Sequence, residues 1–362
     1  MVRLTVRIPE RPYEVVVGSD VIERAGEFLP EFPAAATAFV VADRAVADRW
    51  FGVLASALEA RGVSAVPLTV PAGEAAKTLQ VYETLLHQLA MQEAHRDDLV
   101  VALGGGATGD LAGFVASTYM RGIPFVQVPT TLTAQVDAAI GGKTAVNLPE
   151  GKNLVGTFSQ PRMVLADVGT LATLADRDYR SGLAEVAKYG LALDLEILAL
   201  LESDPAPVLR RDPAVLEALV GRCVAAKARA VEEDERDTGV RLMLNYGHTL
   251  GHALERLDGF GGRSHGEAIA LGMVFAARLA EARGLAQPGL ASRTVRLLSS
   301  LGLDPDGAMP PAADIVASFR LDKKYHDGVR FVLLQEVGSP IVVDDVPETQ
   351  MLEILDDMGA AA

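Results

Sequence analysis

The first half of the chain alternates short apolar segments with segments of helix length, and this alternation constrains the fold more than any other feature. Residues 4–8, 13–17, 38–41, 65–70 and 98–103 have the composition of strands. Residues 21–28, 49–60 and 79–92 have helical periodicity. Apolar strands joined by helices are typical of a mostly parallel sheet covered by helices.

The pattern changes near Tyr179, where strand signals nearly vanish. Helical periodicity follows over residues 182–201, 213–235, 241–257 and 266–283, and residues 329–334 predict one short strand. We therefore expect an N-terminal α/β domain over residues 1–175, Rossmann-like but atypical. An all-α domain is expected over residues 176–362.

Composition supports two domains and excludes several classes of partner. The chain has 362 residues, of which 49% are hydrophobic, so two cores can form. A net charge of −15 disfavours nucleic acid and anionic membranes. No apolar run approaches the ~20 residues that span a bilayer. Arg3, Arg7, Glu10 and Arg11 interrupt any signal peptide.

The single cysteine, Cys223, cannot form an internal disulfide, so we expect a cytoplasmic protein with a buried thiol. Lysine is scarce, and only 7 of the 33 basic residues are lysine: Lys77, Lys143, Lys152, Lys188, Lys227, Lys323 and Lys324. One interpretation is that lysine is retained at anion-binding positions. The other is that a biased genome composition has reduced the number of lysines without regard to position. Spacing alone leaves both interpretations open.

A glycine-rich segment, residues 103–110, follows a strand and precedes a helix expected over residues 111–120. Glycines let the backbone approach a pyrophosphate, and a helix N-terminus offers it free N–H groups. Gly104, Gly106 and Gly109 match G-x-G-x-x-G, but the acidic residue usual ~20 positions later is absent. Asp43, at the end of an earlier strand, is an alternative ribose ligand. The segment favours nucleotide binding over a turn without a ligand.

A polar stripe follows in the second half. If residues 241–257 are helical, Arg241, Asn245, His248 and His252 share one face, with spacings of 4, 3 and 4. Buried polar groups need partners, so this face is expected to line a site.

Two further segments complete a candidate metal centre. Ser264 and Glu267 match a capping box, which places His265 at a helix start. Glu185 and Lys188 are one helical turn apart. Two histidines and one carboxylate, with an open position, form a common catalytic zinc set. The alternative is that these histidines are separate core or surface residues, as we interpret His87 and His95.

Together these motifs resemble those of the 3-dehydroquinate synthase family. The motifs are residues 104–110, Thr130 and Thr131 through residues 137–143, residues 151–153, 184–190, 245–252, 265–267 and 322–324. They occur in the family's order and extend from Ala72 to Arg330, over two-thirds of the chain. All seven lysines fall on or beside the family's site positions, which favours the functional interpretation of their scarcity.

The resemblance implies NAD as cofactor, bound in the N-terminal domain. The matching positions are Asp43, Gly73, Glu74, Lys77, Gly105, Gly106, Ala107, Thr108, Gly109, Asp110, Thr130, Thr131, Asp137, Lys143, Lys152, Thr170, Leu171, Ala172 and Thr173. It also implies Zn²⁺ or Co²⁺ on Glu185, His248 and His265.

The resemblance further implies an anionic sugar-acid phosphate as substrate. Its phosphate is expected to contact Lys143, Asn153, Asn245, His252 and one of Lys323 and Lys324, and its carboxylate is expected to contact Lys227 and Arg241. Lys188 is expected near the reacting carbons. Arg121 is expected to contact the phosphate of the neighbouring subunit in a homodimer, although its spacing alone suggests a helix-end arginine.

The implied reaction converts 3-deoxy-D-arabino-heptulosonate 7-phosphate to 3-dehydroquinate and phosphate. NAD oxidises one hydroxyl transiently, phosphate leaves, the hydride returns and an intramolecular aldol step closes the ring, with His252 as a proton relay. The rival interpretations are a metal-dependent alcohol or glycerol dehydrogenase, another sugar phosphate cyclase and an inactive NAD-binding regulator. The lysine-rich set argues against the dehydrogenase, and Lys227 and Arg241 argue against a substrate without a carboxylate.

Overall fold

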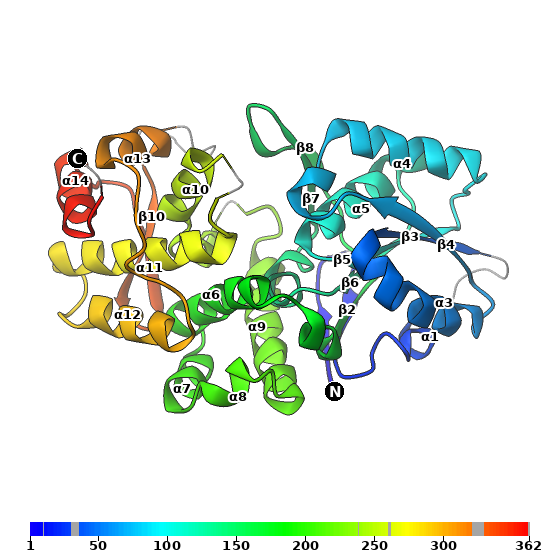
Figure 1. The fold of residues 1–362 in the computed structure, drawn as a ribbon, viewed down its shortest axis with the longest axis horizontal. Coiled ribbons are helices and arrows are strands. Elements are labelled where there is room, and N and C mark those ends of the chain that lie inside the picture. Colours follow the sequence, from blue (N-terminus) through cyan, green and yellow to red (C-terminus); the bar gives the residue numbers. More distant parts are fainter. Residues whose placement is uncertain (10, 30–35, 238, 260–261, 321–328, 361–362) are drawn as a thin grey trace. The chain divides into compact units, whose positions relative to one another are not determined.

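The computed structural model describes residues 1–9, 11–29, 36–237, 239–259, 262–320 and 329–360. The chain forms two compact units (Figure 1). Unit 1 contains Met1–Leu174 and Pro213–Arg236, and unit 2 contains Ala175–Asp212 and Asp237–Ala362. Within the described residues, no helix is both long and apolar enough to cross a membrane.

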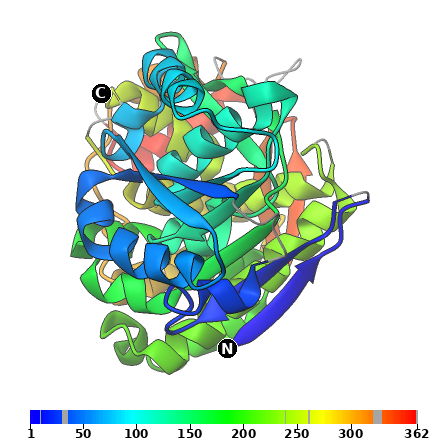
Figure 2. The ribbon, with the colours of Figure 1, turned by 90° about the vertical axis from the view of Figure 1, so that its right-hand side faces the viewer.

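Unit 1 is built on a seven-stranded sheet with the order β1-β2-β9-β6-β5-β3-β4. The strands are β1 (Val2–Val6), β2 (Tyr13–Gly18), β3 (Thr37–Asp43), β4 (Ser64–Val70), β5 (Leu99–Gly104), β6 (Phe125–Pro129) and β9 (Met163–Asp167). Only β1 pairs antiparallel, and β1 lies at the edge of the sheet (Figure 2). The expected mostly parallel sheet is therefore confirmed.

Side chains that alternate along the central strands build one core on each face of this sheet. Val40 and Val101 pack with α1 (Ala25–Phe28) and α3 (Gly52–Glu59). Phe39 and Val100 pack on the other face with α4 (Leu79–Met91) and α5 (Gly106–Thr118). Figure 1 shows these two pairs of helices on opposite sides of the strands. Consecutive residues of a strand point to opposite faces of the sheet. A strand with an uninterrupted apolar run therefore has apolar side chains on both faces, and helices must cover each face.

Shorter elements complete unit 1. They are α2 (Arg44–Val46), the π-helical turns η1 (Ala47–Phe51) and η4 (Ala134–Ala138), the 3₁₀ turns η2 (Gly73–Ala76), η3 (Tyr119–Arg121) and η5 (Val168–Thr173), and an antiparallel hairpin of β7 (Lys143–Leu148) and β8 (Gly151–Phe158). The sequence patterns predicted neither this hairpin nor β9.

The long helix α9 (Pro213–Glu233) also belongs to unit 1, where it packs against β1, β2, η4 and η5. A Cβ on Gly221 would lie 3.2 Å from Val2, so the helix lies close to the edge strand. The single boundary expected after residue 175 is therefore wrong for this segment, because the apolar face of α9 covers the N-terminal sheet.

Unit 2 is mainly helical and is centred on α11 (His265–Ala282), which is buried along most of its length. Around it pack α6 (Asp176–Ala192), α10 (His248–Leu257), α12 (Leu290–Ser300), α14 (Glu348–Asp357) and β10 (Phe331–Glu336). The remaining elements are α7 (Leu195–Ser203), α8 (Ala206–Leu209), the 3₁₀ turn η6 (Val240–Asn245), α13 (Ala312–Phe319) and β11 (Ser339–Val343).

Three sequence expectations for unit 2 need correction. The unit is not all-α, because β10 and β11 form an antiparallel hairpin of which only the first strand was expected. The helix expected over residues 182–201 is two helices, since Asp194 caps the N-terminus of α7. The helix expected over residues 241–257 is broken at Gly247, which has a left-handed backbone with φ 79°.

Candidate metal centre and glycine loop

Three helices of unit 2 bring Glu185, His248 and His265 together. Glu185 lies on α6, His248 is the first residue of α10, and His265 is the first residue of α11. One ligand atom of each lies within 4.8 Å of the others. Glu185 Oε1 is 3.0 Å from His265 Nε2 and 3.4 Å from His248 Nε2. Ligand atoms about 3.3 Å apart are expected around a tetrahedral ion with bonds of about 2.0–2.1 Å, so these residues fit a divalent metal.

The outer nitrogens of both histidines also have acceptors. His248 Nδ1 is 3.1 Å from the carbonyl oxygen of Tyr246, and His265 Nδ1 is 3.2 Å from Glu255 Oε2. A histidine that donates through Nδ1 keeps the lone pair of Nε2 for a metal. Both Nε2 atoms lie near Glu185, so the arrangement is that of a His₂Glu centre with a position left for a further ligand.

Local sequence explains how these side chains are placed. The expected capping box is confirmed: Ser264 accepts from the Glu267 N–H, and Glu267 accepts from the Ser264 N–H, so α11 begins at His265. The left-handed Gly247 ends the preceding turn and starts α10 at His248. A Cβ on Gly272 of α11 would lie 1.8 Å from the Gly247 carbonyl oxygen. Glycines at positions 247 and 272 therefore let the backbone just before His248 lie close to α11.

Buried charges around Glu185 set its protonation. Burial alone would raise the pKa of the Glu185 carboxyl, but the Lys188 ammonium and hydrogen bonds with His248 and His265 hold that pKa well below its usual range. Burial and the Lys188 charge lower the pKa of His248 to about 4. For His265, burial is outweighed by hydrogen bonds with Glu185 and Glu255, which raise the pKa to about 10. A metal ion would therefore replace a proton on His265.

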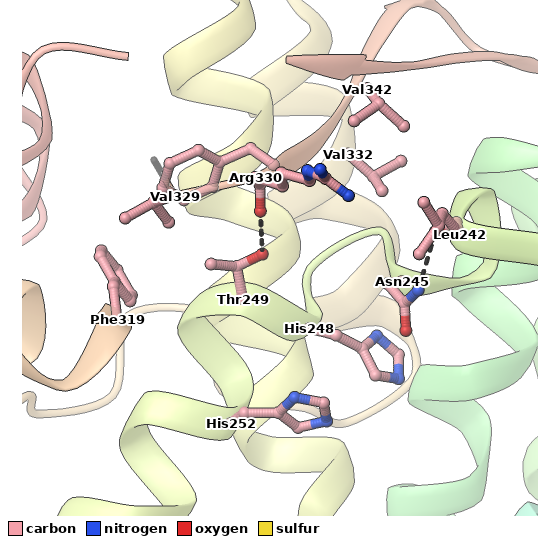
Figure 3. A pocket seen from close by; sticks show the side chains of 11 residues that line it. Leu242, Asn245, His248, Thr249, His252, Phe319, Val329, Arg330, Val332 and Val342 are labelled. Carbon is pink, nitrogen blue, oxygen red and sulfur yellow. Dashed lines mark hydrogen bonds between the residues drawn. The ribbon is translucent and has the colours of Figure 1, made fainter. Parts of the chain in front are cut away.

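His252 and Asn245 lie beside this centre. The His252 ring centroid is 5.4 Å from that of His248 and 6.5 Å from that of His265. His248, His252 and Asn245 line a cavity of about 50 Å³ whose other wall includes Val332 and Val342 (Figure 3).

The expected single stripe of Arg241, Asn245, His248 and His252 does not occur on one helix. Arg241 and Asn245 belong to η6, before the break at Gly247. Arg241 is fully buried, and Asn245 Nδ2 donates to the Leu242 carbonyl. Lys323 and Lys324 lie outside the described residues.

In unit 1, the glycine loop connects β5 to α5. Gly105 is the N-cap of α5, and Gly106–Asp110 form its first turns. A Cβ on Gly104 would lie 2.8 Å from Thr108 Oγ1, and one on Gly109 would lie 2.7 Å from Gln127 Oε1. The glycines thus permit close packing, while the N-terminus of α5 keeps backbone N–H groups for an anion.

Other expected cofactor residues follow the carboxyl ends of parallel strands, where open α/β sheets bind their ligands. Asp43 ends β3 and caps α2, Thr130 and Thr131 follow β6, and Thr170 lies in η5 after β9. Gln135, which sequence reasoning missed, donates to Pro129 O, Asp167 O and Thr170 Oγ1 at 3.1, 2.8 and 3.1 Å. It therefore ties two of these strand ends together.

A second group in unit 1 forms around the buried Lys77. Its ammonium donates to Asp110 Oδ2 at 2.6 Å and also to Asn153 Oδ1. Asn147, another residue that sequence reasoning missed, accepts from the Asn153 N–H at 2.9 Å and donates to Glu74 Oε2 at 2.7 Å. Burial raises the pKa of Asp110, and the Lys77 charge opposes that rise.

The remaining expected site residues of unit 1 lie on α9, on the β7–β8 hairpin and on η3. Lys227 of α9 donates to Asp137 of η4 at 2.7 Å. Lys143 begins β7 and Lys152 follows the start of β8. Arg121 is exposed, and Met120, Arg121 and Gly122 all have positive φ, at 49°, 69° and 119°.

These features define a two-unit enzyme, in which an α/β unit with a glycine loop is joined to a helical unit that carries a His₂Glu centre. Comparisons with known proteins narrow this class. The family model for the 3-dehydroquinate synthase N-terminal domain matches residues 67–181, and the model for the 3-dehydroquinate synthase C-terminal domain matches residues 182–325. The chain belongs to the 3-dehydroquinate synthase family.

Relatives of that name match over almost their full lengths. The chain is 44% identical to 3-dehydroquinate synthase from Pelobacter propionicus, over 94% of this chain and 95% of that protein. It is 46% identical to the enzyme from Geobacter metallireducens, over 95% of this chain and 96% of that protein.

Solved structures give the same picture of the fold. A 2-deoxy-scyllo-inosose synthase complexed with carbaglucose-6-phosphate, NAD⁺ and Co²⁺ has a TM-score of 0.87 at 29% identity, covering 98% of this chain and 99% of that one. The 2-epi-5-epi-valiolone synthase of Streptomyces hygroscopicus, with NAD⁺ and Zn²⁺ bound, has a TM-score of 0.87 at 28% identity, covering 97% and 98%. An iron-containing alcohol dehydrogenase shares the fold alone, with a TM-score of 0.63 at 15% identity.

Proposed function

We propose that this enzyme is a carbon–oxygen lyase that converts 3-deoxy-D-arabino-heptulosonate 7-phosphate to 3-dehydroquinate and phosphate, with NAD and Zn²⁺ or Co²⁺ as cofactors. The observation that carries the proposal is the His₂Glu centre, in which each histidine donates through Nδ1 and directs Nε2 toward Glu185. Family membership supports the substrate. The single cysteine, Cys223, is buried, and we place the enzyme in the reducing cytoplasm.

When bound, the metal supplies Lewis acidity to a substrate hydroxyl, and NAD accepts and then returns a hydride. The residues of this chain bind and orient the metal, NAD and the substrate. Glu185, His248 and His265 would hold the metal. Asp43, Glu74, Lys77, the loop Gly105–Asp110, and the strand ends at Thr130 and Thr170 would hold NAD. The glycine loop suits a pyrophosphate because its backbone is accessible and the N–H groups of α5 carry partial positive charge.

Substrate anions are assigned to cationic and amide side chains. In unit 2, Asn245 and His252 are assigned to phosphate and Arg241 to carboxylate, and Lys188 is placed near the reacting carbons. In unit 1, Lys143 and Asn153 are assigned to phosphate, and Lys227 to carboxylate. In a chain with a net charge of −15, local positive side chains are needed to attract a multiply charged anion. His252, 5.4 Å from His248 by ring centroids, is the candidate proton relay.

We further propose that the enzyme is a homodimer in which Arg121 contacts phosphate bound by the other subunit. Three consecutive residues with positive φ, two of them not glycine, form a strained turn. This turn presents an exposed Arg121 beside Met120, which is 41% exposed. A guanidinium binds phosphate through two parallel hydrogen bonds, which suits it to this role.

The reaction is tested by comparing the amounts of product and NADH formed when NAD is limiting. Purified enzyme is incubated with Zn²⁺, substrate and NAD at one-hundredth of the substrate concentration, and phosphate, 3-dehydroquinate and NADH are measured. We expect phosphate and 3-dehydroquinate in equal amounts, many turnovers per NAD and no accumulation of NADH. Pretreatment with a chelator should abolish both products, and Zn²⁺ or Co²⁺ should restore them. NADH formed in proportion to product would instead identify a dehydrogenase.

A further inference from the structure

We propose that Glu255 is a positioning residue that holds the imidazole of His265 in the tautomer and orientation required to bind the metal. The inference rests on the proposed metal site. It concerns a residue that lies outside the three ligands and has no role in the mechanism given above.

The geometry of the His265 ring carries the inference. A neutral imidazole has one N–H and one lone pair, so Nε2 can bind a cation only if the proton is on Nδ1. His265 Nε2 lies 3.0 Å from Glu185 Oε1, on the metal side, and Nδ1 lies 3.2 Å from Glu255 Oε2. The carboxylate accepts a hydrogen bond from Nδ1–H, which keeps the proton on Nδ1 and leaves the lone pair of Nε2 directed toward Glu185.

Glu255 acts through His265 and does not bind the metal itself. The ligand cluster that lies within 4.8 Å contains Glu185, His248 and His265 and does not include Glu255. The two ring nitrogens of an imidazole point in diverging directions, so a group bonded to Nδ1 faces away from an ion on Nε2. Glu255, His265 and the metal would thus form a carboxylate–histidine–metal triad, in which the carboxylate orients the histidine.

The packing of α10 against α11 fixes this contact. Glu255 is seven residues after His248 on α10, and both therefore lie on one face of the helix. A Cβ on Gly251 would lie 2.9 Å from Ile269 of α11, so a glycine there brings the two helices close. Glu255 is 8% exposed, and a carboxylate at that burial requires a hydrogen-bonding partner.

The two histidines differ in the charge of their acceptors. His248 donates to the neutral carbonyl of Tyr246, whereas His265 donates to a carboxylate. Glu255 adds a second negative charge to that of Glu185 at this site, where Lys188 contributes a positive one. Replacement of Glu255 by a neutral residue removes this negative charge and makes His265 a weaker donor, so the metal affinity should fall.

The experiment compares metal binding by the wild-type enzyme and Glu255→Gln, which is nearly isosteric. Zn²⁺ affinity is measured by competition with a chromophoric chelator, without substrate. We expect the affinity of Glu255→Gln to be about 10–100-fold weaker, as is typical for the loss of such a partner. Glu255→Asp, which keeps the charge on a shorter side chain, should recover part of this loss.

A spectroscopic measurement separates positioning from a general structural effect. The enzyme is labelled with ¹⁵N-histidine and saturated with Zn²⁺, and the Nδ1–H resonances of His248 and His265 are recorded. In Glu255→Gln, the strongly hydrogen-bonded His265 signal should shift or exchange away, while the His248 signal should remain. Wild-type affinity together with an unchanged His265 signal in Glu255→Gln would overturn the inference.

Glu281→Gln is the matched control. Glu281 lies on α11, the helix that begins with His265, and its carboxylate accepts hydrogen bonds from the N–H groups of Gly289 and Ala291 at 2.8 and 2.9 Å. Its replacement should lower the melting temperature without changing Zn²⁺ affinity. If Glu255→Gln does not fold, the comparison of Glu255→Asp with the wild type decides. If the wild-type protein binds no Zn²⁺, the metal site itself is refuted. If the wild-type protein and Glu255→Gln bind Zn²⁺ equally, only the role of Glu255 is refuted.

Discussion

Lys188 and Glu185 form an ion pair at a place where both side chains are only 1% exposed. The Glu185 carboxylate also contacts two histidines. In the metal-free protein, however, its charge is compensated mainly by Lys188. A bound divalent cation would take over much of that compensation. The importance of Lys188 for stability should therefore depend on whether metal is present.

We predict that Lys188→Met destabilises the metal-free enzyme by about 3–5 kcal/mol, because it removes the main cation that compensates a buried carboxylate. The deficit should shrink when Zn²⁺ is present. Thermal unfolding in chelator and in saturating Zn²⁺ measures both values. Lys227→Met is the control, since Lys227 pairs with Asp137 in unit 1 and its loss should be insensitive to Zn²⁺. An equal loss for Lys188→Met under both conditions would assign Lys188 to packing alone.

At this scale, local patterns predicted where Glu185 and His265 lie, whereas the choice of His248 as the second candidate histidine ligand followed from the family resemblance. The capping box places His265, and helical spacing pairs Glu185 with Lys188. The role of Glu255 depends on how α10 crosses α11, which residue spacing does not encode. One signal was nevertheless available: Glu255 follows His248 by seven residues and His252 by three, so all three share a helix face.

Among the elements, the break between η6 and α10 decides where His248 lies. Gly247 and Gly272 meet so closely that a Cβ on Gly272 would lie 1.8 Å from the Gly247 carbonyl oxygen. That atom belongs to the backbone immediately before His248. A larger residue at position 272 of α11 would therefore displace His248, a candidate metal ligand that is distant in sequence.

We predict that Gly272→Ala destabilises the enzyme by about 1–3 kcal/mol or more through overpacking, and that it also weakens Zn²⁺ binding. Chemical denaturation and chelator competition measure the two effects. Gly52→Ala is the matched control, because Gly52 has a helical backbone and an added Cβ meets nothing within 4 Å. That control should be neutral or more stable by about 0.5–1 kcal/mol. Wild-type metal affinity in Gly272→Ala would show that the backbone before His248 moves independently of α11.

The same break explains why the polar stripe from Arg241 to His252 was mispredicted as one helix. Polar spacing of 4, 3 and 4 satisfies helical periodicity, but Gly247 at φ 79° interrupts the helix. An isolated glycine in a helical pattern does not reveal its φ, because glycine accepts both signs. The β7–β8 hairpin was missed for a related reason. None of the eight residues of β8 is buried, and its apolar residues Leu154, Val155 and Phe158 do not alternate with polar ones, so β8 lacks the pattern that predicts a strand.

At the scale of the whole molecule, the proposed role of Arg121 makes activity depend on association. Its strained, exposed turn lies in unit 1, as does Lys143. If Arg121 serves the phosphate of the other subunit, each site takes Arg121 from one chain and Lys143 from the other. Inactive variants at the two positions should then complement one another.

We predict that Arg121→Ala and Lys143→Ala homodimers each lose at least about 100-fold in kcat/KM, since each removes a charged phosphate contact worth roughly 3 kcal/mol. Mixed dimers should recover one intact site, and therefore up to half of the wild-type activity. Differently tagged subunits, exchanged and purified through both tags, allow this measurement. Arg121→Ala mixed with itself is the control. Verified heterodimers as inactive as both parents would place Arg121 at a site of its own chain.

The division into an α/β unit and a helical unit was predictable from the change of pattern near residue 179. The return of α9 to unit 1 was not. Periodicity shows that a helix has an apolar face but does not identify the surface that covers it. Here the covering surface includes Val2, more than two hundred residues away in the sequence from Gly221.

That return has a consequence for the order in which the protein is made. Unit 1 lacks α9 until residues 175–236, which are 62 residues, have also been synthesised. At about 5–20 residues per second, a ribosome needs roughly 3–12 s for that stretch. Throughout this interval the nascent sheet lacks the helix that packs against β1 and β2, and β1 is an edge strand. Apolar side chains that α9 buries in the finished protein are therefore exposed during this interval, and we expect the growing polypeptide to be prone to association until α9 has been made.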